Sequence, residues 1–150
     1  ERKLESISAE NMLKVFTANT VIPSLWLKNL TPHLKSTEPC KVALFSARIG
    51  SISDNQLGGW YSYRASKAAL NMMVKTFSVE LARRAKNVKL LAFHPGTTDT
   101  PLSEPFQRSV PEGKLFTPEF VAAQLLSLLE TLEMDGKASY MDWNHQSITW

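Results

Sequence analysis

The sequence has few glycines and a single cysteine. The first scarcity argues against a pyrophosphate-binding turn, and the second excludes an internal disulfide. Only six of the 150 residues are glycine, and none lies in the strand, glycine-rich turn and helix pattern that binds a dinucleotide pyrophosphate. One cysteine, Cys40, cannot form an internal disulfide, and so low a cysteine content is typical of a reducing compartment. We therefore expect no pyrophosphate-binding turn within these residues, and a cytoplasmic location.

Charge of one sign and long apolar runs are also scarce. Seventeen Lys and Arg residues against fourteen Asp and Glu residues give a net charge of +3, and the basic residues are scattered along the chain. This distribution argues against nucleic-acid binding. The longest apolar stretches fall far short of the roughly 18 residues of a membrane span, and no spacing of His, Cys and Asp indicates a metal site. The sequence predicts no nucleic-acid partner, no membrane partner and no metal.

The apolar pattern predicts alternating helices and strands. We expect a helical stretch from Ser8 to Leu34 interrupted near 19–23, a buried strand at 41–46, a long helix at 60–86, a second buried strand at 88–93, an irregular loop at 94–116, a helix at 117–132 and an edge strand at 138–143. Elements of these lengths in this order imply an α/β layered fold. Its parallel strands are expected to be buried on both faces.

The most informative stretch reads GWYSYRASKAALN and spans Gly59–Asn71. Tyr63 and Lys67 stand four residues apart near the start of the long predicted helix, so their side chains lie one turn apart on the same face. A fixed positive charge beside a phenol favours the phenolate, so we expect the pKa of Tyr63 to fall from about 10 toward neutrality. A phenol tuned in this way can donate or accept a proton at a carbonyl or alcohol oxygen.

Pro23 predicts a gap in the first helical stretch. A proline has no N–H to donate to the carbonyl of the residue four positions back, which here is Asn19. A helix with such a gap kinks, and the free carbonyl can bind a water molecule. We therefore expect a kink at Asn19 with a hydrogen-bond acceptor available there.

Three separated segments occur in a particular order. A strand ends in Ser46-Ala-Arg-Ile-Gly50, the Tyr63–Lys67 segment continues as Ala-Ala-Leu-Asn, and a second strand opens into His94-Pro-Gly-Thr-Thr-Asp-Thr100. Together they resemble the C-terminal two-thirds of a short-chain dehydrogenase/reductase, and most of all the bacterial C-factor group, which is named for a role in cell–cell signalling. The resemblance implies that residues 1–150 belong to a single Rossmann-like domain. Its doubly wound parallel sheet would be present without the N-terminal glycine-rich βαβ unit.

The resemblance implies an oxidoreductase that transfers hydride between NAD or NADP and a small carbonyl or alcohol. It gives Tyr63 the role of catalytic acid and base. It also implies that Lys67 lowers the pKa of Tyr63 and binds the nicotinamide ribose. Asn19 matches the asparagine at the family's helix kink, where a water bound to the carbonyl continues the proton relay. Tyr63, Lys67 and Asn19 are therefore candidate catalytic residues, and Tyr63 and Lys67 are also candidate cofactor-binding residues.

A second group of candidate cofactor-binding residues follows the second predicted strand. Pro95, Gly96, Thr98 and Thr100 match the segment that borders the nicotinamide in the family. Gly96 would allow the backbone to approach the ring closely. The backbone of Thr98 and the hydroxyl of Thr100 are expected to bind the carboxamide, which fixes the ring face that delivers hydride.

One position departs from the family's pattern. The catalytic serine that donates a hydrogen bond to the substrate carbonyl falls on Ala47 in this sequence. Losing one comparable donor costs on the order of a hundredfold or more in rate. Ser46 or Ser51 could replace it if the strand end shifts. The sequence thus leaves two functions open: an active oxidoreductase, or a catalytically weak signalling or cofactor-sensing protein with the same fold.

Two further expectations concern the substrate and the partners. The resemblance places the loop at 102–116 over the substrate, and its apolar residues indicate an apolar or mixed pocket. The long helix is apolar on more than one face, so it needs a second packing partner. In the family the two long helices, here at 18–35 and 60–86, pack against their copies, which predicts a homodimer or homotetramer. The alternative is that residues outside this sequence cover that face.

Overall fold

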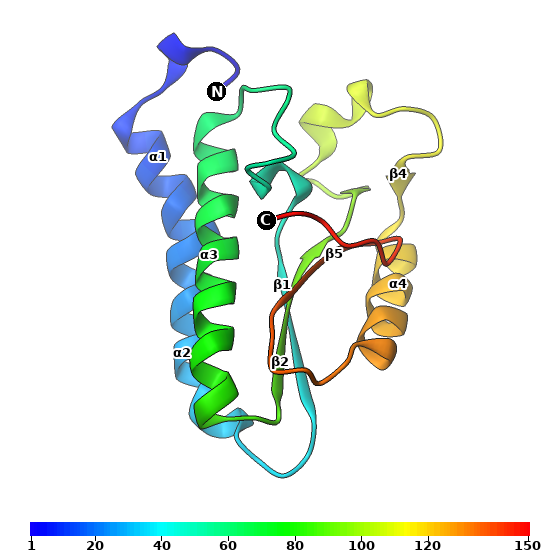
Figure 1. Cartoon of the computed structure of the whole chain (residues 1–150). Helices are drawn as coiled ribbons and strands as arrows, with labels where there is room; N and C mark the ends of the chain where they lie inside the picture. Colours follow the sequence, from blue (N-terminus) through cyan, green and yellow to red (C-terminus); the bar gives the residue numbers. More distant parts are fainter.

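The computed structural model covers residues 1–150 and shows a parallel sheet between two helical layers (Figure 1). The elements are η1 Leu4–Ser6, α1 Ala9–Phe16, η2 Thr17–Val21, α2 Ile22–Leu34, β1 Cys40–Phe45, η3 Arg48–Gly50, α3 Tyr61–Arg84, β2 Val88–His94, β3 Thr97–Thr98, η4 Glu104–Ser109, β4 Leu115–Phe116, α4 Pro118–Thr131 and β5 Ser139–Asp142. The main sheet has the strand order β1-β2-β5, and β3 and β4 form a separate short pair. None of the helices has both the length and the apolarity that crossing a membrane requires.

The first helical stretch passes through a π-helical turn at the predicted interruption. α1 begins after Ser8, whose side chain accepts a hydrogen bond from the Asn11 N–H. In η2 the helix widens, and the Ile22 N–H bonds to the Thr17 carbonyl, five residues back. Pro23 follows immediately and cannot donate to the Asn19 carbonyl, which favours this irregular turn. The predicted interruption near residues 19–23 is confirmed.

The three strands of the main sheet are parallel. β1 pairs with β2 from Cys40 opposite Val88 to Phe45 opposite Phe93, and the other edge of β2 pairs with β5. β2 is therefore central and almost wholly buried, and the predicted edge position of residues 138–143 is confirmed. The expectation that strand 41–46 is buried on both faces is wrong. The outer edge of β1 has no partner strand, and its last residue, Phe45, is 55% exposed.

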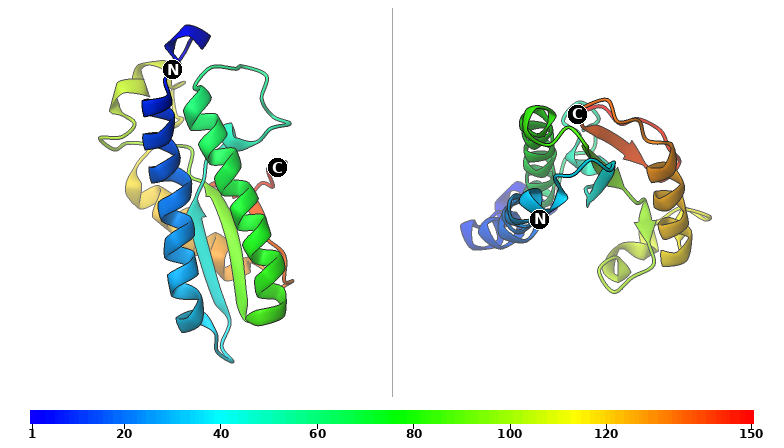
Figure 2. Two further views of the ribbon diagram at one scale, coloured as in Figure 1. Left: turned by 90° about the vertical axis from the view of Figure 1, so that its left-hand side faces the viewer. Right: turned by 90° about the horizontal axis from the view of Figure 1, so that it is seen from below.

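The core consists of two clusters, one on each face of the sheet. Leu90 and Ala92 of β2 belong to the cluster under α2 and α3, whereas Leu91 and Phe93 belong to the cluster under α4. Alternation along the strand explains this division, because successive side chains point to opposite faces. The end-on view in Figure 2 shows α3 on one side of the sheet and α4 on the other. The fold is the expected doubly wound α/β arrangement.

The buried face of α3 is unexpectedly polar. The residues it buries include Ser62, Ser66, Lys67, Asn71 and Ser78. Lys67 donates to the Phe45 carbonyl at the end of β1, and Asn71 accepts from Ser46 just beyond it, so polar groups help to fix α3 on the sheet. Some apolar side chains of α3 are exposed to solvent, among them Met72 and Val79.

The segment between β2 and α4 is largely irregular, as predicted, but it is not without structure. It contains the two-residue parallel pair of β3 and β4, with Thr97 opposite Leu115 and Thr98 opposite Phe116. The 3-10 turn η4 lies between them. This pairing holds the start and the end of the segment together.

Candidate active site at the carboxyl end of the sheet

The carboxyl ends of β1 and β2 and the start of α3 meet at one end of the sheet, the upper end in Figure 1. Because the strands are parallel, the segments that follow them leave from the same edge. β1 continues into Ser46 and Ala47, β2 continues into Pro95, and α3 starts nearby with Tyr63 in its first turn. The fold thus brings the separated sequence motifs to one edge.

Tyr63 and Lys67 lie one turn apart on α3, as their spacing predicted, but they differ in exposure. Tyr63 is 37% exposed and Lys67 only 9%. The Lys67 Nζ donates a hydrogen bond to the Phe45 carbonyl at 2.8 Å and lies 5.9 Å from the centroid of the Tyr63 ring. The lysine therefore joins α3 to the end of β1 beneath the tyrosine.

The pKa values of the two side chains move in directions set by burial. Partial removal from water raises the pKa of Tyr63 above its ordinary value, and burial lowers the pKa of Lys67. The expectation that Lys67 lowers the pKa of Tyr63 is therefore wrong for this structure. The physical reason is that the Lys67 ammonium is bound to the Phe45 carbonyl rather than to the phenol oxygen.

Asn19 connects the π-helical turn to the catalytic segment of α3. Its Nδ2 donates to the Ser66 Oγ at 3.0 Å, and the Ser66 Oγ donates in turn to the Tyr63 carbonyl at 2.9 Å. The neighbouring Thr20 Oγ1 donates to the Ser66 carbonyl at 2.8 Å. The kinked helix thus holds the turn of α3 that carries Tyr63 and Lys67.

The two serines that could replace the serine missing at Ala47 take part in separate polar clusters. Ser46 is 3% exposed, and its Oγ donates to the Asn71 Oδ1 at 2.6 Å. Ser51 is 1% exposed, and its Oγ lies 3.4 Å from the Thr149 Oγ1. Both hydroxyls therefore already have partners within the chain.

Asn71 and Tyr140 support this end of β1, and sequence reasoning missed both. Besides accepting from Ser46, Asn71 lies 3.4 Å from the Gly50 carbonyl through its Nδ2, and the Tyr140 hydroxyl donates to the Ala47 carbonyl at 2.7 Å. Asn71 could have been found, because it lies one further turn along the face of α3 that carries Lys67. No sequence signal connects Tyr140 to Ala47.

Two residues of the segment after β2 show how it could accept a ligand. A Cβ at Gly96 would lie 2.7 Å from the Phe116 ring and 3.0 Å from the Trp143 ring, and its φ is +74°, so protein packing alone requires glycine there. The Thr98 Oγ1 is buried and has no hydrogen-bond partner, whereas the Thr100 Oγ1 donates weakly to the Thr98 carbonyl at 3.4 Å. The unpartnered hydroxyl fits an amide ligand such as the carboxamide of nicotinamide.

His94 lies beside an ion pair at the same edge, between the half-exposed Arg48 and the buried Asp142. The Arg48 Nη2 donates to the Asp142 Oδ2 at 2.6 Å, and Asp142 stands opposite His94 in the sheet. Burial and the Arg48 charge lower the pKa of His94 to about 4, although Asp142 acts in the opposite direction. His94 is thus neutral at pH 7, and its buried Nδ1 has no partner.

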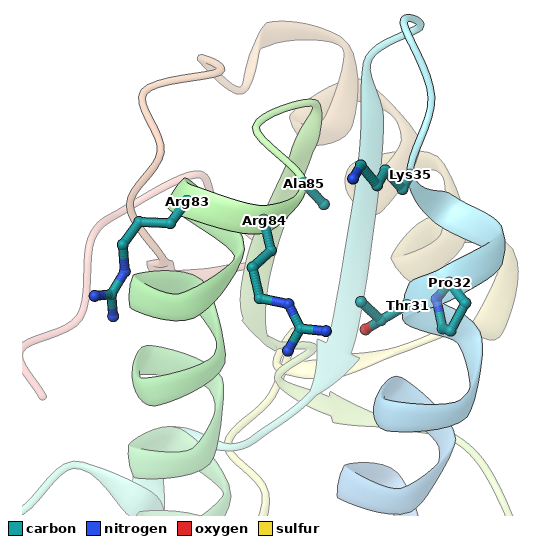
Figure 3. A pocket seen from close by; sticks show the side chains of 6 residues that line it. All are labelled: Thr31, Pro32, Lys35, Arg83, Arg84 and Ala85. Atoms are coloured by element: carbon teal, nitrogen blue, oxygen red, sulfur yellow. The ribbon is translucent and has the colours of Figure 1, made fainter.

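A basic cavity at the far end of the molecule is not part of this site. The cavity has a volume of about 260 Å³ and lies between the ends of α2 and α3, where Figure 3 shows Arg84 extending toward Thr31 and Lys35 above them. Arg84 also forms an ion pair with Glu80. Helix geometry puts Arg84 roughly 30 Å from Tyr63 along α3. Basic residues in the last turn of a helix are expected there, because they offset the helix dipole.

Comparison with known proteins shows similarity along the chain. The family model described as short chain dehydrogenase matches residues 1–110. The 1-hydroxy-2-glutathionyl-2-methyl-3-butene dehydrogenase of a Rhodococcus species is 37% identical over 83% of this chain and 53% of its own length. The C-signal of Myxococcus xanthus is 29% identical over 98% of this chain and 83% of its own length.

A solved structure agrees with the fold. The NADPH-bound carbonyl reductase from chicken fatty liver superimposes with a TM-score of 0.84 at 25% identity, covering 99% of this chain and 60% of that structure. The chain thus spans about half the length of the Rhodococcus relative and about 60% of the solved reductase.

Proposed function

Because the chain belongs to the short-chain dehydrogenase family, we propose that it forms the catalytic part of an NAD(P)-dependent oxidoreductase that acts on a small carbonyl or alcohol. One observation carries the proposal. The half-exposed Tyr63 stands one helical turn before the buried Lys67, at the edge where the strands of the sheet end.

The residues divide into proton transfer and cofactor binding. Tyr63 donates the proton to the substrate oxygen during reduction and accepts it during oxidation, while NADH or NADPH, when bound, supplies the hydride. Lys67 binds the nicotinamide ribose, and Asn19 holds the turn of α3 that carries both side chains. Thr98 and Thr100 bind the carboxamide, and the unpartnered Thr98 hydroxyl supports this assignment.

The raised pKa of Tyr63 suits the reductive direction. A phenol whose pKa lies above about 10 is fully protonated at pH 7. It can therefore act as a general acid as it stands, whereas alcohol oxidation needs the phenolate and must first remove that proton. A protonated Tyr63 is thus ready to act as the general acid of carbonyl reduction near neutral pH.

The names of the relatives and the loop at 102–116 support the substrate class. One relative is named as a dehydrogenase of a hydroxy compound, and one structural neighbour as a carbonyl reductase. Within the loop, Leu102 is 84% exposed and Phe106 is 48% exposed. Apolar side chains at this place favour a substrate with an apolar portion.

A second candidate function is signalling or cofactor sensing with little turnover. Two observations favour it. Ala47 stands where the family has its catalytic serine, and the match to the C-signal of Myxococcus xanthus, at 29% identity, covers 98% of this chain. In this alternative the protein keeps the fold and binds the cofactor without rapid chemistry.

Binding and turnover together distinguish the two functions. NADH and NADPH binding to the full-length gene product is measured by fluorescence, and consumption of the bound cofactor is then followed with a panel of aromatic and aliphatic ketones. Binding with turnover supports the oxidoreductase, and binding without turnover supports the signalling function. Absence of binding contradicts both.

We also propose that residues 1–150 are the C-terminal two-thirds of one domain. The unpaired edge of β1 borders an apolar cavity of about 330 Å³ lined by α2 and β1 residues, among them Trp26, Leu30 and Phe45. A further parallel strand placed there would cover these side chains and extend the sheet. A cytoplasmic location is part of the same proposal, supported by the unpaired Cys40.

Ala47→Ser is expected to raise kcat for carbonyl reduction by about a hundredfold, because it restores one hydrogen-bond donor at the position that the family uses. The steady-state kinetics of the full-length protein measure the effect. Ala85→Ser is the matched control, since Ala85 is buried to a similar extent, at 3% exposure against 8%, near the far end of α3. Equal kcat values for Ala47→Ser and the unsubstituted protein would exclude a role for a hydroxyl at this position.

We propose that the protein is a homodimer or homotetramer through the outer faces of the η2–α2 stretch and α3, which lie side by side in Figure 2. Ala65, Met72 and Val79 are spaced seven residues apart on α3, so they lie on nearly the same face. Met72 is 63% exposed and Val79 is 60% exposed. Trp26 on α2 is 64% exposed. Apolar side chains gathered on one face indicate an interaction surface.

Met72→Glu is expected to convert the oligomer to a monomer, because each interface would then bury an unpaired carboxylate. Sedimentation velocity measures the mass. Leu126→Glu on α4 is the matched control, since Leu126 is also 63% exposed but lies in the other helical layer. A monomeric unsubstituted protein, or an oligomer that both variants leave intact, argues against this interface.

A further inference from the structure

The Ser103 hydroxyl stands at the centre of the segment that follows β2. Its Oγ donates to the Thr98 carbonyl at 2.5 Å and also lies 3.1 Å from the Thr100 carbonyl. The same oxygen accepts from the Thr100 N–H at 3.3 Å and from the Gln107 Nε2 at 2.9 Å. One side chain thus connects both ends of the three-residue segment 98–100 to the turn η4.

Gln107 adds a second connection from the same turn. Its Nε2 also donates to the Asp99 Oδ1 at 2.8 Å, and the Asp99 N–H donates to the Phe116 carbonyl at 2.8 Å. Each residue of 98–100 therefore has at least one partner outside the segment. These side-chain contacts add to the backbone hydrogen bonds that the Ser103 and Glu104 N–H groups donate to the Thr100 carbonyl.

These hydrogen bonds use the Thr98 carbonyl but leave the Thr98 hydroxyl without a partner. The Thr98 carbonyl accepts from Ser103 and Thr100, so a ligand has to compete for it. The Thr98 hydroxyl is buried and unpartnered. A segment held in this way before binding loses little conformational entropy when an amide ligand bonds to that hydroxyl.

We propose that Ser103, assisted by Gln107, is a positioning residue that holds Thr98–Thr100 ready for the nicotinamide carboxamide. The inference rests on the proposed function, because it takes the ligand to be NADH or NADPH. Ser103 acts through the threonines and does not itself touch the cofactor. It stands seven residues beyond the family-like Pro-Gly pair at Pro95 and Gly96.

The test compares Ser103→Ala with Ser109→Ala in the full-length protein. Ser109 is the last residue of η4, the turn that begins directly after Ser103, and its Oγ donates only to the Phe106 carbonyl. Ser103→Ala is expected to weaken NADPH binding by about tenfold, the effect of one hydrogen bond of ordinary strength, and to raise KM for the cofactor with little change in kcat. Ser109→Ala should match the unsubstituted protein, and Ser103→Thr, which keeps the hydroxyl, should restore binding.

Amide hydrogen exchange provides a readout that needs no cofactor. The Asp99 and Thr100 amides should exchange faster in Ser103→Ala than in Ser109→Ala. Equal cofactor affinity and equal exchange in the two alanine variants would overturn the positioning role. If the unsubstituted protein binds neither NADH nor NADPH, the proposed function fails, and the assignment of Ser103 to a cofactor site fails with it.

Discussion

Replacing Tyr63 with Phe is expected to lower kcat for carbonyl reduction by about 10²–10⁴-fold, the usual contribution of one positioned general acid. The substitution removes only the hydroxyl and keeps the ring over the buried Lys67, whose Nζ bonds to the Phe45 carbonyl. NADPH affinity should therefore remain close to that of the unsubstituted protein. Single-turnover kinetics and fluorescence titration measure the two quantities separately.

Tyr61→Phe is the matched control, since Tyr61 lies two residues earlier in the same helix and projects from a different face. It should leave kcat unchanged. The titration of the phenol gives an independent signature. Because burial raises the pKa of Tyr63, the tyrosinate absorbance that Tyr63→Phe removes should appear only above about pH 10 in the unliganded protein. A Tyr63→Phe variant with full turnover contradicts the assigned role. A Tyr63 that ionises near neutrality would instead contradict the upward effect of burial on its pKa.

The local part of this site could be predicted from the sequence. Tyr63 and Lys67 share a face because helix periodicity depends only on neighbouring residues. The interruption of the helix near Asn19 follows from the missing N–H of Pro23, which is equally local, although the π-helical form of the turn was not predicted. Both features were readable without knowing how α3 packs on the sheet.

The partner of each side chain could not be predicted in the same way. Lys67 bonds to the Phe45 carbonyl, and Ser46 bonds to Asn71. Both hydrogen bonds depend on the position of α3 along the direction of β1. This register is set by contacts between distant parts of the chain. The predicted direction of the Tyr63 pKa shift was wrong for this reason, because the position of the Lys67 ammonium decides its effect on the phenol.

Strand geometry shows whether the Ser46 hydroxyl can replace the serine hydroxyl that is missing at position 47. Successive side chains of an extended chain point to opposite sides, and Ala47 is extended, with φ −159° and ψ 144°. Ser46 points into the interior toward Asn71, so the side chain of Ala47 points the other way. A hydroxyl at position 46 therefore cannot take the place of one at position 47 without a shift of the backbone, which is why Ala47→Ser is the informative substitution.

Replacing Asp135 with Asn is expected to destabilise the fold by about 3 kcal/mol, the lower end of the effect of breaking a buried ion pair. Lys89 lies in the central strand β2 with only 1% of its side chain exposed, and its Nζ bonds to the Asp135 Oδ1 at 2.5 Å. The substitution leaves a buried ammonium without its carboxylate. Asp135 itself is 40% exposed, and the resulting solvent screening accounts for the lower value.

Thermal unfolding should show a Tm lower by about 6–12 °C for a chain of this size. Asp54→Asn is the matched control. Asp54 pairs with Arg48 at 3.6 Å with both side chains more than 40% exposed, and removing such a surface pair costs less than about 1 kcal/mol. Lys89→Met, which removes the buried charge itself, should be better tolerated than Asp135→Asn, because the Asp135 carboxylate that then loses its partner is 40% exposed and can be hydrated.

The pH dependence separates loss of the ion pair from loss of packing. The hydrogen bond from Lys89 is the main cause that lowers the pKa of Asp135. A carboxylate with a lowered folded-state pKa contributes stability above its unfolded pKa of about 3.9, and this contribution is lost as the pH falls through the folded value. The difference in unfolding free energy between the unsubstituted protein and Asp135→Asn should therefore be constant from about pH 8 to 5 and shrink below about pH 4. A difference that persists unchanged in acid would mean that Asp135 acts through packing rather than through its charge.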